Sequence, residues 1–356
     1  MGEATLPVLL PLGLTLGPTG LWWTHLLVMV GMYALLGLSL NLINGYGRMF
    51  SLGHHGFWAL GAYAAGSLVH HAAGSMPGTL LFLLSVVLAV GVAALGGLLI
   101  GVPCLRLKGD YLAVATLGFG EILRISIQNL PQDLLGANIG LTVPRVLLEK
   151  TPETKGLFQA GWAGIVLVAV ALVALLVRNL VTSARGRDML AVAQDEVAAG
   201  LLGIDPTRSK VAPFVVGAAL AGLAGALYAH YQGTIAPQEF TFLEMVKMLL
   251  VVVLGGLGSI SGCILAAFVL LYVEQVLQLA GQDTLPAGVP PLPASWTWLA
   301  EWWSVLYALV LVLLMIFRPH GLLGTRELTD LVRSWRRPRG GAAPGAAAGP
   351  GGGPRA

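Results

Sequence analysis

Residues 78–101 read GTLLFLLSVVLAVGVAALGGLLIG, a run without a charged residue that is long enough to cross a membrane as a helix. A helix needs about 20 apolar residues to span the hydrocarbon core of a bilayer. The whole chain has the same character, with 56% hydrophobic residues, 10% charged residues and a mean hydropathy of +0.81. Soluble domains carry about 25% charged residues. The sequence therefore predicts an all-α polytopic membrane protein.

Apolar runs of similar length recur along the chain and predict about eight to ten transmembrane helices, some of them short or broken. Residues 5–17 are apolar but contain two prolines, so they either span the membrane or lie at its interface. Runs 242–257 and 259–279 are either two short crossings joined by a tight turn or one broken element. The predicted spans are 21–43, 51–71, 78–101, 111–130, 161–179, 211–232, 242–257, 259–279 and 302–317.

The loops predict the orientation. If every run crosses once, most Lys and Arg residues fall on one side, and the opposite loops contain only Arg145, Lys150 and Lys155. Cytoplasmic loops carry such an excess of basic residues. We therefore expect a multi-pass protein of a bacterial-type inner membrane with a cytoplasmic C-terminus. The loops on the basic side are 44–50, 102–110, 180–210, 258 and 318–356.

The chain divides into three parts. Residues 1–19 form an N-terminal apolar segment, residues 20–325 a transmembrane domain with a cytoplasmic loop at 180–210, and residues 326–356 a basic, Gly/Pro/Ala-rich tail. The tail is predicted to be disordered because it lacks the apolar residues of a core. Its portion RSWRRPR (333–339) is expected to anchor the topology by touching anionic lipid, and we expect no contact with nucleic acid.

The charged residues within the spans come in pairs. Glu121 and Arg124 are spaced i,i+3 and share a helix face, and Glu244 and Lys247 repeat this spacing. A lone charge near the bilayer centre costs about 2.5–3.5 kcal/mol, so each charge is expected beside its counter-ion. Each pair is therefore either a structural ion pair or a polar element of a path for a solute.

Small residues are frequent within the predicted spans. The spacing Gly97-x-x-x-Gly101 and the stretch GAALAGLAGA (217–226) let two helix backbones approach closely in lipid. Two further stretches, NGYGRMFSLGHHG (44–56) and GGLGSISG (255–262), are candidates for interrupted backbone. Such backbone is tolerated at membrane depth only where it is buried in protein or lines an aqueous cavity.

Neither the cysteines nor the histidines predict a metal site or a disulfide framework. Cys104 and Cys263 lie in or beside apolar runs, and the histidines include two adjacent pairs. Neighbours on a helix point about 100° apart and chelate poorly. We therefore expect no metal and no cofactor in this chain. The adjacent pairs are His54/His55 and His70/His71.

The loop at 183–210 reads SARGRDMLAVAQDEVAAGLLGIDPTRSK and predicts two short helices at the membrane surface. Ser183 can cap the first helix, Gly200 and Gly203 are stop signals, and Pro206 is expected to end any helix. Apolar residues recur at helical spacing, so the loop is either an interfacial helix or a docking helix for a cytoplasmic subunit. These residues are Met189, Leu190, Val192, Ala193, Val197, Leu201 and Leu202.

The stretch EVAAGLLGI (196–204) resembles the E-x-A-A-x-x-x-G-I signature of ABC-importer permeases. GYGRMFSLGHHGFWALGAYAAG (45–66), LRLKGDYLAVATLGFGEILRI (105–125) and the region 214–262 are similar, in order and spacing, to permeases of branched-chain amino acid ABC transporters. The similarity is to the M-type member of the paired permeases and covers roughly residues 30–325. Two departures are LLGANIG (134–140), where the family often carries a Thr-Gly-Gly element, and Cys263, where a proline is common.

This resemblance implies an ABC-importer permease fold and an import complex. The partners would be a second related permease, two cytoplasmic ABC ATPase subunits and an extracytoplasmic binding protein that delivers branched-chain or other neutral amino acids. The implied ATPase-coupling residues are Arg187, Asp195, Glu196, Ala198, Ala199, Gly203 and Ile204. The residues expected to shape the translocation path are Gly118, Gly120, Glu121, Arg124, Asn129 and Asn138.

The chain lacks the G-x-x-x-x-G-K-[ST] motif, so ATP is expected to be hydrolysed on separate partner chains, and we expect no enzyme activity in this chain. Three other functions stay open on the sequence. One is import of urea or short amides by a similar permease. Another is an ion-coupled secondary transporter that uses Glu121/Arg124 and Glu244/Lys247 as coupling groups. The third is a purely structural membrane partner.

Overall fold

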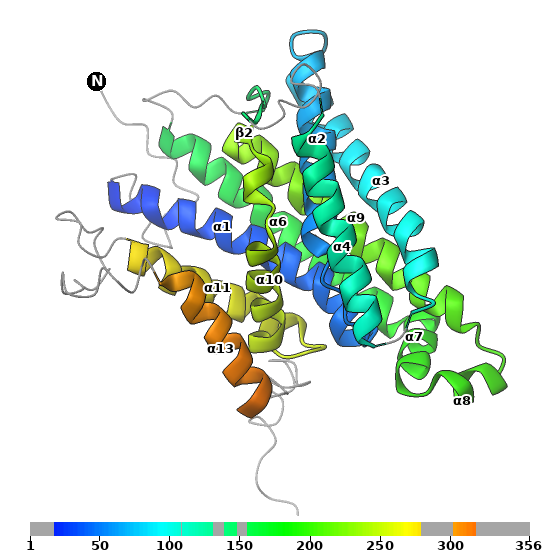
Figure 1. The fold of residues 1–356 in the computed structure, drawn as a ribbon. Helices are drawn as coiled ribbons and strands as arrows, with labels where there is room; N and C mark the ends of the chain where they lie inside the picture. Colours follow the sequence, from blue (N-terminus) through cyan, green and yellow to red (C-terminus); the bar gives the residue numbers. More distant parts are fainter. Residues whose placement is uncertain (1–17, 108, 131–138, 148–154, 279–301, 318–356) are drawn as a thin grey trace, which may run out of the picture.

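The computed structural model describes residues 18–107, 109–130, 139–147, 155–278 and 302–317 (Figure 1). The segments predicted at 5–17 and 326–356 lie outside the described residues, as does Asn138. The described chain is a bundle of helices with one short two-stranded sheet, as the apolar runs predicted. The helices are α1 (Pro18–Asn41), α2 (His54–Ala72), α3 (Gly78–Cys104), α4 (Asp110–Gln128), α6 (Lys155–Thr182), α7 (Ala184–Gln194), α8 (Glu196–Leu201), α9 (Pro206–Gln232), α10 (Phe242–Gly255), α11 (Ile260–Gln278) and α13 (Trp303–Phe317).

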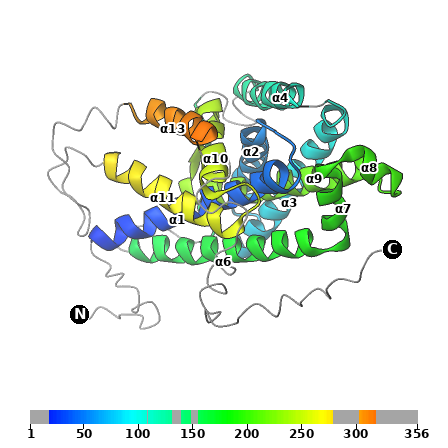
Figure 2. The same ribbon diagram turned by 90° about the horizontal axis from the view of Figure 1, so that it is seen from below.

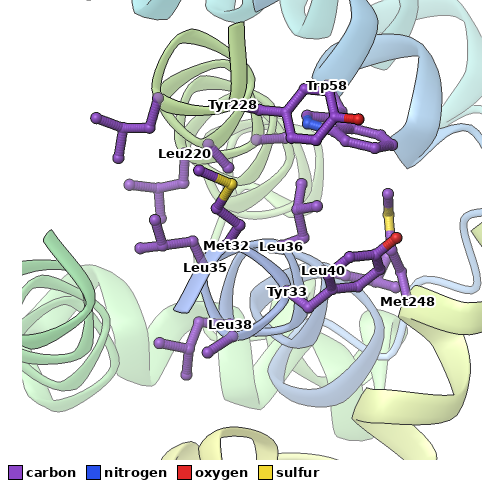
Figure 3. Packing of buried hydrophobic residues seen from close by; sticks show 14 of the residues in the cluster. Met32, Tyr33, Leu35, Leu36, Leu38, Leu40, Trp58, Leu220, Tyr228 and Met248 are labelled. Carbon is purple, nitrogen blue, oxygen red and sulfur yellow. The ribbon is translucent and has the colours of Figure 1, made fainter. Parts of the chain in front are cut away.

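Helix α1 lies at the centre of the bundle. Every residue from Val30 to Asn44 is buried, and α1 packs against α6, α9, α10 and α11. A helix that is apolar on all sides is stable only when surrounded by other elements or by lipid. Figure 2 shows α6 along one edge of the molecule, with α4 and α13 at the opposite edge. The packing of α1 against its neighbours is drawn in Figure 3.

Five helical segments of the described chain are long and apolar enough to cross a membrane, namely Leu21–Tyr46, Gly78–Cys104, Leu157–Thr182, Pro206–Gln232 and Ile260–Leu277. The segments predicted at 242–257 and 259–279 are two separate helices, α10 and α11. With 14 residues, α10 is only about 21 Å long, which is less than the roughly 30 Å of a bilayer core. The prediction of short elements is therefore confirmed for α10.

The contact between α3 and α9 is built on small side chains. The buried residues of α3 recur every four positions along one stripe, which includes Ala89, Ala93 and Gly97. A Cβ atom at Gly97 would lie 2.5 Å from the Ala218 Cβ atom of α9. The exposed side of α3 carries leucines and valines such as Leu99, which is 74% exposed. Dispersion contacts between close backbones hold such helices together in lipid, where the hydrophobic effect does not.

The contact between α2 and α9 is tighter still. A Cβ atom at Gly61 would lie 2.3 Å from the carbonyl oxygen of Gly222, and one at Gly225 would lie 2.3 Å from the carbonyl oxygen of Trp58. These neighbours are backbone atoms, which cannot turn aside as a side chain can. The stretch 217–226 is thus a helix-packing surface, as its composition predicted.

The backbone is interrupted in both predicted stretches, 44–56 and 255–262, and the side chain of Asn41 links the end of α1 to the second one. After α1 the chain forms a π-helical turn, η2 (Leu42–Tyr46), and the turn between α10 and α11 contains Gly256 and Gly258 at positive φ. The Asn41 side chain donates to the carbonyl oxygen of Ser259 at 3.1 Å and accepts the Gly258 N–H at 2.9 Å. The broken backbone is therefore satisfied within the protein, as membrane depth requires.

A short antiparallel sheet lies beyond the C-terminal end of α9. Strand β1 (Leu141–Thr142) pairs with β2 (Thr234–Ile235), and Leu141 lies opposite Ile235. The 3₁₀ helix η3 (Pro237–Glu239) then leads into α10. Figure 1 shows β2 at the end of the molecule away from α7 and α8.

We predict that Gly61→Ala lowers the stability of the bundle. The new methyl group would meet the backbone of α9, and overpacking of this kind costs about 1–3 kcal/mol of unfolding free energy. The matched control is Gly91→Ala on α3, where a Cβ atom meets nothing within 4 Å. Thermal melting of the purified protein in detergent measures both. Equal melting temperatures for the two variants would contradict the close α2–α9 contact.

Candidate functional site

The loop between α6 and α9 is the first candidate site, and its two short helices are confirmed. The Ser183 hydroxyl accepts the Gly186 N–H at 3.2 Å at the start of α7, as predicted for a capping residue. The Asp195 carboxylate caps α8 in the same way, accepting the N–H groups of Val197 and Ala198 at 2.9 and 3.0 Å. Figure 1 shows α7 and α8 together at one end of the molecule.

The prediction that Pro206 ends a helix is wrong. Pro206 is the first residue of α9, and Asp205 caps that helix by accepting the N–H groups of Thr207 and Arg208. A proline is tolerated in the first helical turn because its missing N–H would have no partner there. The turn before it contains Gly203 at φ 81°, so the stop signal lies at the glycine and the proline starts the next helix.

Helix α8 is attached to α9 by an ion pair. The Lys210 ammonium lies 2.8 Å from a Glu196 carboxylate oxygen, and the Ile204 N–H donates to the carbonyl oxygen of Ala199 at 3.1 Å. The Arg187 guanidinium donates to the carbonyl oxygen of Thr182 at 3.0 Å, which ties α7 to the end of α6. Of the predicted coupling residues, Glu196, Ala199 and Ile204 are thus part of one compact turn that is attached to the start of α9.

The outer surface of α8 is apolar and uncovered. The side chains of Val197, Leu201 and Leu202 are 74%, 85% and 81% exposed, whereas Ala199 faces inward and is buried. Apolar residues gathered on a short surface helix indicate an interaction site for lipid or protein. Asp195 and Glu196 fix the start of α8 through the helix cap and the ion pair to Lys210.

The second candidate site is the pair on α4. The Arg124 guanidinium donates to Glu121 at 2.8 Å, and the other Glu121 oxygen lies 3.7 Å from Nε2 of the buried His55. Both members of the pair are partly exposed, at 29% for the Glu121 side chain and 22% for Arg124. The counter-ion predicted from the spacing is therefore present, and His55 is a neighbour that the sequence did not indicate.

The residues predicted for the translocation path do not all lie together. Gly120 packs on α2, where a Cβ atom would lie 2.4 Å from the His55 ring, while Gly118 is exposed and meets nothing within 4 Å. Asn129 is exposed at the end of α4, and its side chain donates to the carbonyl oxygen of Ile125 at 2.7 Å. The structure thus pairs Glu121 with Arg124 and places Gly120 against the His55 ring, whereas Gly118 is exposed.

The third candidate site is a buried charge cluster around Lys247. Its ammonium lies 3.1 Å from Glu244 and 3.0 Å from Glu274 of α11, and 5.3 Å from the centre of the Tyr33 ring of α1. The Tyr33 hydroxyl donates to Glu244. Lys247 and Glu274 are 7% and 8% exposed. The cluster joins α1, α10 and α11, with two carboxylates around one cation.

Sequence reasoning found only half of this cluster. It predicted the pair of Glu244 and Lys247 from the i,i+3 spacing, but it missed Glu274 and Tyr33. The signal for Glu274 was available, because it is an ionisable residue inside the apolar run 259–279. Figure 3 shows Tyr33 of α1 near Met248 of α10, and Trp58 of α2 beside Tyr228 of α9.

Comparison with known proteins identifies the family. The model of a family described as "Branched-chain amino acid transport system / permease component" matches residues 23–315. This chain belongs to that family. The match includes the loop with α7 and α8, the pair on α4 and the cluster around Lys247, so all three candidate sites lie in the permease region.

Individual permeases are similar over most of the chain. The high-affinity branched-chain amino acid transport system permease protein LivM of Salmonella typhimurium is 35% identical over 315 residues, which cover 83% of this chain and 68% of that protein. The probable branched-chain amino acid transport permease protein LivM of Methanocaldococcus jannaschii is 28% identical, covering 85% of this chain and 93% of that protein. LivH of Salmonella typhimurium is 33% identical over 146 residues, covering 41% of this chain and 42% of that protein. No solved structure matches.

We predict that Lys247→Met strongly destabilises this permease. Removing the cation leaves the buried carboxylate of Glu274 without its counter-ion, and breaking a buried ion pair in this way costs about 3–5 kcal/mol of unfolding free energy. Glu244, whose side chain is 25% exposed, keeps the Tyr33 hydroxyl as a donor. The combined variant Lys247→Met, Glu244→Gln, Glu274→Gln removes all three charges and should recover most of the loss. Thermal melting in detergent compares the single variant with the triple variant. If Lys247→Met were as stable as the unmodified protein, the charge cluster would not stabilise the fold.

Proposed function

We propose that the chain is the transmembrane permease subunit of an ATP-driven importer for branched-chain amino acids. Family membership supports the transport role, and the uncovered apolar surface of α8 is the observation that carries the ATP-driven mechanism. ATP would be hydrolysed on partner subunits, because the chain contains no P-loop motif. Val197, Leu201 and Leu202 would dock into an ATPase subunit on the cytoplasmic side.

The contacts of α8 provide a route for force into the membrane domain. The Glu196–Lys210 pair attaches α8 to the start of α9, and α9 packs tightly on α2 through Gly61 and Gly222. A displacement of α8 by a closing ATPase pair would therefore move α9 and its neighbours as rigid rods. Such a two-state movement would open the path for the solute to one side at a time.

The complete importer would contain a second permease, two cytoplasmic ATPase subunits and an extracytoplasmic binding protein. The similarity of this chain to LivM over most of its length and to LivH over a shorter stretch supports a pair of related permeases. The excess of basic residues at the end that carries α7 and α8 supports a cytoplasmic position for that end and for the C-terminus. The binding protein would provide most of the substrate selectivity.

A path for the solute would pass the polar surface of α4. Glu121 and Arg124 are both partly exposed and lie on one helix face, so they could contact a zwitterionic amino acid without an unpaired charge in lipid. Gly120 would keep α4 close to α2 beneath them. Residues 131–138, which include Asn138, lie outside the described residues.

We predict that Glu196→Arg abolishes ATP-driven amino acid uptake in proteoliposomes that contain the complete importer, while the amount of folded permease stays unchanged. The control is the exchange Glu196→Lys with Lys210→Glu, which keeps an ion pair between the same positions. If Glu196 contacts the ATPase directly, the exchange stays inactive. If the pair acts only within this chain, the exchange restores uptake. Normal uptake by Glu196→Arg itself would refute the coupling role.

A second experiment tests the importer scheme as a whole. Proteoliposomes with the permease pair and the ATPases should take up leucine only when ATP is inside and the binding protein is outside. Uptake that a sodium or proton gradient drives without ATP would instead support the ion-coupled transporter. Uptake of urea but not of leucine would support the amide importer.

A further inference from the structure

A groove of about 820 Å³ opens on the surface where α6 ends and α7 begins. Leucines of α6 form one part of its wall, and Val216 of α9 closes one side. The polar residues of the wall are Asn179, Ser183 and Arg185. No residue that lines the groove belongs to α8 or to the charge cluster of Lys247.

The wall changes from apolar to polar along a single helix face. Leu172, Leu175 and Leu176 are 61%, 53% and 44% exposed, and Asn179 follows them at helical spacing. From Leu172 to Ser183 the chain rises by about 16 Å, which is roughly half the thickness of a bilayer core. The whole wall along α6, polar end included, is therefore about as long as one leaflet is deep, and the exposed leucines from 172 to 176 account for about 6 Å of it.

The polar end of the groove carries the guanidinium of Arg185. Within the described parts of the chain, the exposed Arg185 side chain forms no ion pair, whereas Lys210 pairs with Glu196 and Arg208 with Asp205. Arg187 of the same loop likewise forms no ion pair among the described residues, but its guanidinium donates to the carbonyl oxygen of Thr182 and it does not line the groove. A phosphate group is the charge complement of a guanidinium at a membrane boundary.

The leucines of the wall can pack along an acyl chain. The closest helix contacts of this chain are made by small residues, such as Gly97 against Ala218 and Gly61 against Gly222, but α1 packs on its neighbours through leucines. The guanidinium of Arg185, and not the size of Leu172, Leu175 and Leu176, is therefore the feature that favours a phospholipid over an apolar helix as the occupant.

We propose that this groove binds an anionic phospholipid. One acyl chain lies along the leucines of α6, and the phosphate lies at Arg185 with Asn179 and Ser183 beside it. The site would hold a lipid at the base of α7, next to the loop that carries α8. The proposal requires only that the chain spans a membrane, and it does not depend on the transported substrate.

Lipid titration of the purified permease complex, followed by native mass spectrometry, tests whether the charge of Arg185 contributes to lipid binding. Phosphatidylglycerol is expected to bind more tightly than phosphatidylcholine with the same acyl chains. Arg185→Gln should weaken phosphatidylglycerol binding about fivefold, the loss expected for one basic residue at a membrane surface. The matched control is Arg208→Gln in the same loop, which should leave this binding unchanged because Arg208 lies outside the groove. Equal affinities of the Arg185 variant and the unmodified complex would overturn the proposal.

Photo-crosslinking tests the occupant of the groove in the membrane. A benzophenone side chain introduced at Leu176 should form an adduct with phospholipid when membranes that contain the whole complex are illuminated. An adduct with another protein chain would overturn the proposal, because it would mean that a partner permease covers the groove. A benzophenone side chain at Leu201 on α8, which does not line the groove, serves as the comparison.

Discussion

A polar group inside a lipid bilayer must find its partner within the protein, and this constraint decides most of what is irregular in the permease. The helices satisfy their own backbones, but the breaks after α1 and between α10 and α11 do not. Asn41 supplies both a donor and an acceptor to the second break, at 3.1 and 2.9 Å. Asn44 closes the first break by bonding both the N–H and the carbonyl oxygen of Ser51. The same constraint places Lys247 between two carboxylates.

Side-chain size divides the surfaces of the helices into two kinds. Glycine and alanine mark the faces of α2, α3 and α9 that meet one another, whereas leucine and valine mark the faces that point outward. Since α9 belongs to the tightly packed group and also carries the ion pair to α8, helix α8 and the packed helices α2, α3 and α9 form one connected body. If α8 is the docking element proposed above, this connection would carry its displacement to those helices.

Much of the fold could be predicted from the sequence because its strongest signals are local. Long apolar runs define the helices, and a serine before a helical pattern defines the start of α7. The prediction for Pro206 was wrong because a proline is found both just after the end of a helix and in the first turn of one. Only Asp205, which can cap a helix that starts at Pro206, favours the start of a helix here. The i,i+3 pairs were predicted correctly because both partners lie on one helix.

The rest could not be predicted because it depends on how distant segments meet. Glu274 lies 27 positions after Lys247, and no local spacing relates them. Gly118 and Gly120 look equivalent in the sequence, yet only Gly120 faces the ring of His55. The ion pair of Glu196 likewise depends on Lys210, which belongs to the next helix. The candidate site was therefore predicted as a set of residues and not as an arrangement.

The two hydrogen bonds of Asn41 have a mechanical consequence. They tie the end of α1 to the turn between α10 and α11, and the Lys247 cluster ties the same three helices together through Tyr33 and Glu274. A hairpin held at two separated points cannot pivot about either one. If the permease works by the two-state movement proposed above, helices α1, α10 and α11 would therefore travel as a single piece, with the hinge elsewhere in the molecule.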